Sequence, residues 1–360
     1  MKFQKACFSF ILLILLVGCS TNKNVEMPVK IGAVLSLTGF AAYYGENSKN
    51  GMDLAVDEIN QAGGINGIPL QIIYEDDATD GKTAVTAAQK MIDTDKIAAL
   101  LGGTWDVSLG AMVPIADSSK ILLINPSTGN NEEGTRLSPY LFRLWSPTAK
   151  KVRAYAPILD KENIKTVVLF RNSGAWALGH KKALEKLLKE RGGSLFGDIV
   201  GVNVDDNNFY TEITKAKSLS PDAVFLALGL GDTSNVIRRM KEQGFKAKIL
   251  GAEGTMEVVT KNMIVPQDAE GAYFVDLVST DPGFIEKYTA KYGKPPGISA
   301  DTAYKAVQVL AQAYKTTGTT DTEKIRAYLQ SLPLFDEYGD IIMQIPIYQI
   351  QSGKPVLVSK

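Results

Sequence analysis

Two short apolar runs flank an amphipathic segment between residues 96 and 130, and this pattern constrains the fold more than any other feature. Residues 97–101 and 121–124 are apolar throughout, as in strands buried on both faces of a parallel sheet. Apolar residues recur between them at helical spacing, which predicts a strand–helix–strand unit. In open parallel sheets, ligands bind beyond the carboxyl ends of the strands. We therefore expect loops 104–106 and 127–129 to lie side by side at a binding site.

Strand and helix patterns alternate along most of the chain, which is typical of a doubly wound α/β fold. The chain has 360 residues, enough for about two domains, and the alternation is interrupted near residues 142–147. The predicted strands cover residues 30–36, 70–74, 166–170, 194–200, 223–228 and 248–251, and the predicted helices 50–60, 79–93, 107–119, 178–191, 209–217 and 233–243. Helical patterns follow residue 282 without strands between them, and residues 341–358 predict terminal strands around a turn.

The composition excludes several classes of protein. Lys and Arg together number 39, as do Asp and Glu. The chain therefore has no excess of positive charge for binding a nucleic acid. A single histidine provides no His pair for a metal site, and we expect neither metal nor cofactor. No G-x-S-x-G elbow or P-loop occurs, and Gly102-Gly103 lacks the third glycine of a dinucleotide site. We expect a protein that is not an enzyme; a hydrolytic carboxylate pair of Asp106 and Glu253 is the alternative.

The N-terminus has the pattern of a secretory signal. Two lysines precede the apolar run 8–17, which is too short to span a membrane. The tetrapeptide Leu-Val-Gly-Cys at residues 16–19 resembles the lipobox of bacterial lipoproteins. That resemblance implies a signal peptide over residues 1–18, a diacylglyceryl group on Cys19 and a polar tether over residues 19–28. A plain signal peptide with an incidental cysteine is the alternative.

Several segments of the body resemble the family of periplasmic leucine/isoleucine/valine-binding proteins. The most specific is EINQAGGINGIPL at residues 58–70. The others are EDDA at residues 75–78, PDAV at 221–224 and FDEYGD at 335–340. The likeness extends over the body of the chain to its C-terminus.

The resemblance implies two doubly wound parallel-sheet lobes joined by a three-segment hinge, with the ligand trapped between the lobes. It places the crossing segments near residues 143–146, 273–277 and 332–335. The N-terminal lobe would then hold residues 29–145 plus 277–332, and the C-terminal lobe residues 146–276 plus 333–360. We expect a monomer whose lobes close on the ligand.

The resemblance also implies roles for residues in the cleft. A serine that holds the ligand carboxylate in amino-acid-binding members is matched by Asp106, and its threonine helper by Gly129. The acidic residue that holds the ligand ammonium is matched by Glu253. Two aromatic positions are matched by Tyr44 and Trp176. The acidic residue that binds the ligand ammonium is therefore retained in this chain, and the hydroxyl residues that bind the ligand carboxylate are not.

A carboxylate at position 106 changes which ligands the cleft accepts. A ligand carboxylate against Asp106 brings like charges together in a desolvated space, which costs several kcal/mol. We therefore expect leucine, isoleucine and valine to bind poorly. The favoured ligand has an apolar or aromatic body and presents amine, amide or hydroxyl donors to Asp106 and Glu253. The alternatives are that Asp106 only caps the helix that follows it and that Glu253 is a plain surface acid.

Other candidate residues also have two interpretations. Trp105 either lines the cleft or belongs to the core, as does Trp176, and Tyr44 either contacts the ligand or anchors its loop. Ser127 and Thr128 follow a buried strand in a short loop, so we expect their backbone groups to contact the ligand. His180 lies in a Gly-His-Lys-Lys segment and is expected at a solvated helix start.

Together with the resemblance, these patterns predict a lipid-anchored solute-binding protein of an ABC importer, facing the periplasm or the cell exterior. Its expected partners are a small-molecule ligand, the membrane subunits of the importer and, through the lipid alone, the membrane. The alternative is a lipoprotein of the same fold that acts as a sensor or regulator and binds a protein partner.

Overall fold

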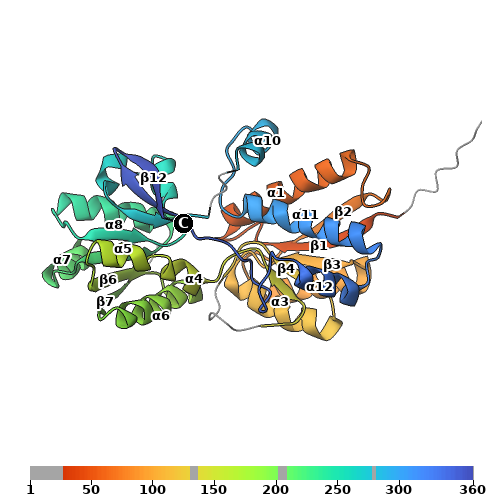
Figure 1. Ribbon diagram of the computed structural model, residues 1–360, viewed down its shortest axis with the longest axis horizontal. Helices are drawn as coiled ribbons and strands as arrows, with labels where there is room; N and C mark the ends of the chain where they lie inside the picture. Colours follow the sequence, from red (N-terminus) through yellow and green to blue (C-terminus); the bar gives the residue numbers. More distant parts are fainter. Residues whose placement is uncertain (1–26, 130–136, 202–208, 278–280, 360) are drawn as a thin grey trace, which may run out of the picture.

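The computed structural model describes residues 27–129, 137–201, 209–277 and 281–359. Within these ranges, two β-sheets covered by helices on both faces form two lobes that lie side by side (Figure 1). We call the lobe that begins the chain the N-terminal lobe and the other the C-terminal lobe. The predicted α/β fold with two parallel-sheet lobes is confirmed. The expected signal peptide, Cys19 and most of the tether lie outside the described residues.

The sheet of the N-terminal lobe is parallel throughout its described strands, in the order β2-β1-β3-β4-β5. These strands are β1 (Val29–Leu35), β2 (Leu70–Asp76), β3 (Ala99–Gly102), β4 (Leu123–Asn125) and β5 (Leu141–Arg143). Strands β3 and β4 are buried at every position, which accounts for their apolar sequences. The sequence patterns miss β5, because three residues are too few for a periodic signal.

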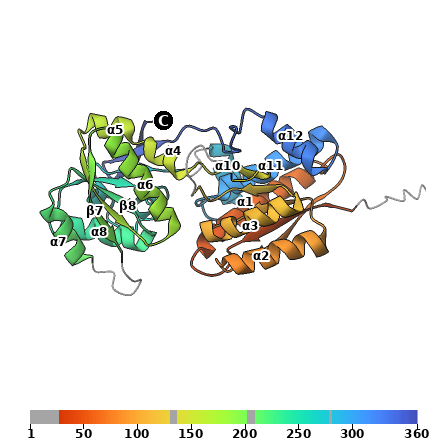
Figure 2. The same cartoon turned by 90° about the horizontal axis from the view of Figure 1, so that it is seen from below.

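The helices of the N-terminal lobe cover both faces of this sheet (Figure 2). These helices are α1 (Ala42–Gln61), α2 (Gly81–Lys90) with the π-helical turn η1 (Met91–Asp95), α3 (Asp106–Ser119), α11 (Ala300–Thr317) and α12 (Thr322–Ser331). A further helix, α10 (Pro282–Tyr292), packs on α1 and α11 and not on the sheet. Apolar residues of α1, α11 and α12 pack on one face, and those of α2 and α3 on the other. Asp80 and Asp321 cap α2 and α12 by accepting hydrogen bonds from backbone N–H groups of the first turn.

The described sheet of the C-terminal lobe has the order β12-β11-β10-β9-β8-β6-β7. Its parallel part contains β6 (Thr166–Arg171), β7 (Ser194–Val200), β8 (Ala223–Ala227), β9 (Lys248–Gly251) and β10 (Tyr273–Val275). An antiparallel hairpin of β11 (Ile347–Gln351) and β12 (Lys354–Ser359) extends one edge, as predicted from the terminal turn.

Helices also cover both faces of the second sheet. Apolar residues of α4 (Thr148–Arg153), α5 (Ala156–Lys161) and α6 (Ala175–Glu190) pack on one face. The other face is covered by α7 (Tyr210–Ser218), α8 (Leu230–Glu242), α9 (Glu257–Thr260) and the 3-10 turn η2 (Pro266–Ala269). Helices α4 and α5 were not predicted, since six residues give less than two turns of periodicity.

Among the described elements, the chain changes lobes after β5, after β10 and between α12 and β11. The last of these crossings lies later than predicted. Phe335 belongs to the core of the N-terminal lobe and Ile341 packs against that core, so the assignment of residues 333–341 to the C-terminal lobe is wrong. A buried ion pair between Arg143 and Asp340 holds this segment beside β5.

The lobes also touch away from the crossings, where α1 approaches α9. The Tyr43 hydroxyl lies 3.2 Å from both carboxylate oxygens of Glu257. The Lys261 ammonium lies 2.6 Å from Glu257 Oε2 and 3.9 Å from the centre of the Tyr43 ring. This contact brings the N-terminal end of α1 close to the C-terminal lobe.

Candidate ligand-binding site

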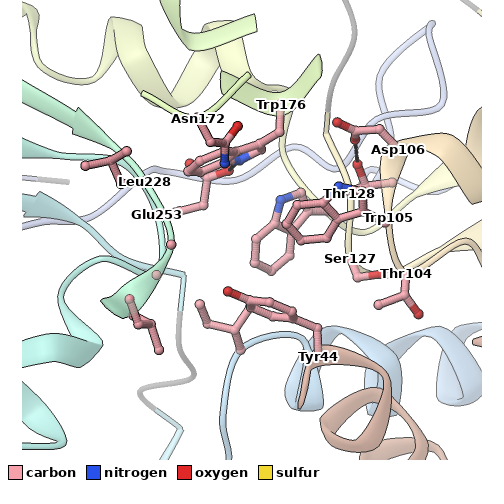
Figure 3. Close-up of a pocket in the computed structure, with 15 residues that line it drawn as sticks. Tyr44, Thr104, Trp105, Asp106, Ser127, Thr128, Asn172, Trp176, Leu228 and Glu253 are labelled. Atoms are coloured by element: carbon pink, nitrogen blue, oxygen red, sulfur yellow. Dashed lines mark hydrogen bonds between the residues drawn. The ribbon is translucent and has the colours of Figure 1, made fainter. Parts of the chain in front are cut away.

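A pocket lies between the two lobes, at the carboxyl ends of strands from both sheets (Figure 3). It encloses about 650 Å³ of space not filled by protein atoms, including the part open to solvent. The seven residues that the sequence suggested as ligand contacts all line it, namely Tyr44, Trp105, Asp106, Ser127, Thr128, Trp176 and Glu253. The structure brings these residues together, and their contact with a ligand stays a prediction.

The buried side chain of Asn125 connects the two strand-end loops of the N-terminal lobe. Its Nδ2 donates to the carbonyl oxygens of Gly102 and Gly103, at 2.7 and 2.8 Å. Its Oδ1 accepts from the backbone N–H of Thr128 at 2.9 Å. These bonds hold the loops after β3 and β4 side by side, so the arrangement predicted from the two apolar runs is confirmed.

Asp106 is the first residue of α3, and the N-cap position belongs to Trp105. The interpretation of Asp106 as the helix cap is therefore wrong. Its Oδ1 instead accepts a hydrogen bond from Thr128 Oγ1, across the gap between the two loops (Figure 3). A carboxylate in the first turn is also favoured by the positive end of the helix dipole.

Aromatic side chains form the wall of the pocket on the side of the N-terminal lobe. Tyr44 lies in the first turn of α1 and not in a loop, because the helix begins at Ala42. The ring centres of Tyr44 and Trp105 are 5.6 Å apart, and Phe40 packs edge-on against Trp105 at 5.3 Å. Burial raises the pKa of Tyr44 above its ordinary value, so the hydroxyl stays protonated and can donate a hydrogen bond.

Glu253 follows β9 and lies at the centre of a buried polar cluster in the C-terminal lobe. Lys151 of α4 forms an ion pair with its Oε1, and Trp176 Nε1 donates to the same oxygen at 2.9 Å. His180 Nε2 lies 3.0 Å from Oε2. The histidine is only 1% exposed, so its predicted place at a solvated helix start is wrong. Because α6 carries Trp176 and His180 four residues apart, both side chains reach Glu253 from one face.

Burial and neighbouring charges act in opposite directions on the pKa values of Glu253 and Lys151. Burial by itself would raise the pKa of Glu253, but Lys151 and His180 outweigh it and hold that pKa well below its usual value. Burial lowers the pKa of Lys151, and the attraction of Glu253 and Asp106 opposes this. Glu253 is thus an ionised carboxylate that already has a counter-ion. We expect from the sequence that Glu253 is free to bind a ligand ammonium. In the structure, the ammonium of Lys151 already pairs with it.

The model of the periplasmic binding protein family matches residues 28–348 of the chain. The chain belongs to the periplasmic binding protein family. Relatives that align over about nine-tenths of the chain confirm the resemblance to the leucine/isoleucine/valine-binding members of this family. The leucine-, isoleucine-, valine-, threonine- and alanine-binding protein of Pseudomonas aeruginosa is 27% identical over 344 residues, 90% of each chain. The Leu/Ile/Val-binding protein of Escherichia coli K12 is 27% identical over 351 residues, 91% of this chain and 93% of the other.

Solved structures of periplasmic binding proteins have the same fold. The branched-chain amino acid transporter substrate binding protein LivJ of Streptococcus pneumoniae, in complex with isoleucine, has a TM-score of 0.80 at 25% identity. The match covers 92% of this chain and 100% of LivJ. A solute binding protein of an ABC transporter from R. palustris, in complex with benzoate, has a TM-score of 0.79 at 21% identity, covering 92% and 96%. The second likeness supports the fold alone.

Several residues that line the pocket of this periplasmic binding protein were missed from the sequence. Asn172 follows β6, and residues 228–230 follow β8. Ligands bind beyond the carboxyl ends of parallel strands, so the signal that predicted the loops of the N-terminal lobe was also available for these residues. Trp145 lies shortly after β5, which was not predicted, and Ile298 precedes α11 far along the chain without a local signal.

Helices of the described ranges are all too short or too polar to cross a membrane. In the same ranges, His, Cys, Asp and Glu side chains form no group that could hold a metal ion.

Proposed function

We propose that this protein is a lipid-anchored, extracytoplasmic solute-binding protein that traps a small ligand between its lobes and delivers it to an ABC importer. The observation that carries the proposal is the convergence of side chains from both lobes on one pocket at the strand ends. A ligand in this pocket would contact both lobes at once. Its binding would therefore favour the closed arrangement of the lobes over an open one.

The relatives support this function and indicate the size of the ligand. The E. coli relative is a Leu/Ile/Val-binding protein, LivJ holds isoleucine and the R. palustris protein holds benzoate. These ligands share a compact apolar body. Such a body suits a pocket with Tyr44, Trp105, Trp145 and Trp176 in its walls. The proposed polar contacts are Asp106, Ser127, Thr128 and Glu253.

A ligand screen by thermal unfolding tests this function. We expect a small apolar or aromatic solute to raise the melting temperature, since a ligand at 100 times its Kd adds about 2.7 kcal/mol to the free energy of unfolding. Trp105→Ala should remove most of that shift, because Trp105 lines the pocket. Phe196→Ala truncates an aromatic residue of β7 that is 48% exposed and should leave the shift unchanged. If no compound of the screen raises the melting temperature, the alternative of a sensor that binds a protein partner is favoured.

The lipid anchor is a separate part of the proposal, because Cys19 lies outside the described residues. We expect the wild-type protein in the membrane fraction and the Cys19→Ala protein in the soluble fraction, since acyl chains supply the proposed attachment. Globomycin, which blocks the lipoprotein signal peptidase, should cause the wild-type precursor to accumulate. Cys7→Ala is the matched control, because Cys7 lies in the predicted signal peptide. Retention of the Cys19→Ala protein on the membrane would contradict the anchor.

A further inference from the structure

Both oxygens of the Glu253 carboxylate are engaged by the protein itself. Oε1 accepts from Lys151 Nζ and Trp176 Nε1, and Oε2 faces His180 Nε2. The side chain of Glu253 is 4% exposed. A solute in the pocket therefore meets a carboxylate whose charge is already compensated.

Lys151 is enclosed as tightly as its partner. Its side chain is 1% exposed, and its Nζ lies 5.1 Å from the centre of the Trp145 ring, within the range of a cation–π contact. It reaches Glu253 from α4, the first helix after the first crossing. Asp106, on the opposite lobe, adds to the attraction on its ammonium. The carboxylate of Glu253, which lines the pocket, is thus already paired with a buried cation of the protein.

We infer that Lys151 is a built-in counter-ion that sets the ligand class, so that the pocket prefers small apolar or aromatic solutes without a cationic amino group. This inference rests on the proposed solute-binding function and specifies its ligand. A ligand ammonium would lose its hydration, find both oxygens of Glu253 engaged and lie near the like charge of Lys151. A solute without that group avoids these costs and keeps the same apolar contacts.

Matched ligands that differ only in the amino group test the inference. The acid pairs are leucine with 4-methylpentanoate and phenylalanine with 3-phenylpropanoate. The four corresponding amides lack the ligand carboxylate, so that any effect of Asp106 on this group is separated from the effect of the amino group. Calorimetric titration of the wild-type protein should show the amine-free member binding at least about tenfold more tightly than its partner, a difference of about 1.4 kcal/mol.

Lys151→Met tests the residue itself, because it removes the charge and keeps a long unbranched side chain. We expect the preference to shift by at least about tenfold toward the amine-bearing member, since a ligand ammonium can then take the place of the missing one at Glu253. Lys150→Met is the matched control. Lys150 is the preceding residue and pairs instead with Asp336 at 2.8 Å, so its loss should leave the preference unchanged.

Each outcome of this experiment decides something. Tighter binding of the amine-bearing member by the wild type, or an unchanged preference in Lys151→Met, would overturn the inference and leave the solute-binding function standing. A lack of binding by all eight compounds, on wild type and variant alike, would contradict both. The wild-type comparison requires no substitution, so it decides the matter even where Lys151→Met does not fold.

Discussion

Glu253→Ala is expected to lower the free energy of unfolding by about 3–5 kcal/mol, the usual cost of removing one partner from a buried ion pair. The side chains of Glu253 and Lys151 are 4% and 1% exposed, so the ammonium left behind is shielded from solvent. The indole N–H of Trp176 and the ring of His180 lose their acceptor in the same step. Urea denaturation of wild type and variant measures the difference.

Two further variants test whether the lost free energy of unfolding comes from the buried ion pair. The double variant Glu253→Gln/Lys151→Met replaces both charges by neutral side chains of similar size, a change that is often close to neutral for buried pairs. It should therefore recover most of the stability. Glu190→Ala breaks the Arg153–Glu190 pair, whose side chains are 47% and 38% exposed, and should cost less than about 1 kcal/mol. A similarly small loss for Glu253→Ala would be inconsistent with a strong buried pair.

Gly102→Ala is expected to lower the free energy of unfolding by about 3 kcal/mol or more. A Cβ atom at this position would lie 2.0 Å from the carbonyl oxygen of Val34, and the φ of Gly102 is +121°. L-residues with a side chain rarely adopt this φ. Gly102 pairs with Val34 in the ladder between β3 and β1, so neither backbone can move away without disturbing the sheet. Denaturation curves of the purified variant, or its failure to accumulate in folded form, provide the measurement.

Gly110→Ala is the control for this substitution. Gly110 lies in α3, and a Cβ added there would meet no atom of the described residues within 4 Å. We expect a gain of about 0.5–1 kcal/mol, because alanine loses less conformational entropy in a helix. A neutral effect of Gly102→Ala would mean that the strand end beside the pocket can relax, which its tight backbone contact argues against.

Local patterns in the sequence were sufficient for the doubly wound α/β class, and the two lobes with three crossings came from the resemblance. The apolar runs at residues 97–101 and 121–124 require burial on both faces, and a parallel sheet covered by helices provides it. Because the carboxyl ends of neighbouring parallel strands meet at one edge of the sheet, loops 104–106 and 127–129 are expected beside each other, and the hydrogen bonds of Asn125 confirm this. The resemblance to the leucine/isoleucine/valine-binding proteins supplied the candidates in the C-terminal lobe, which local pattern alone did not indicate.

Short elements and the last crossing depended on tertiary contacts. Strand β5 and helices α4 and α5 are too short to show a period, and they are ordered by packing against segments distant in the chain. The last crossing begins after residue 341, because Phe335 is buried in the N-terminal lobe and Asp340 pairs with Arg143. Neither contact can be inferred from sequence spacing.

The electrostatics of the pocket were decided by the tertiary structure as well. The sequence alone places two carboxylates, Asp106 and Glu253, near the ends of two predicted strands. It contained no signal that Lys151 and His180 point at Glu253. Lys151 lies on α4, His180 lies on α6 and Glu253 follows β9. Coulomb interactions depend on distance and on exclusion of water, and both arise only when these three segments pack together. The sequence therefore determined which charged groups the protein has, and the fold decided which of them already have a partner.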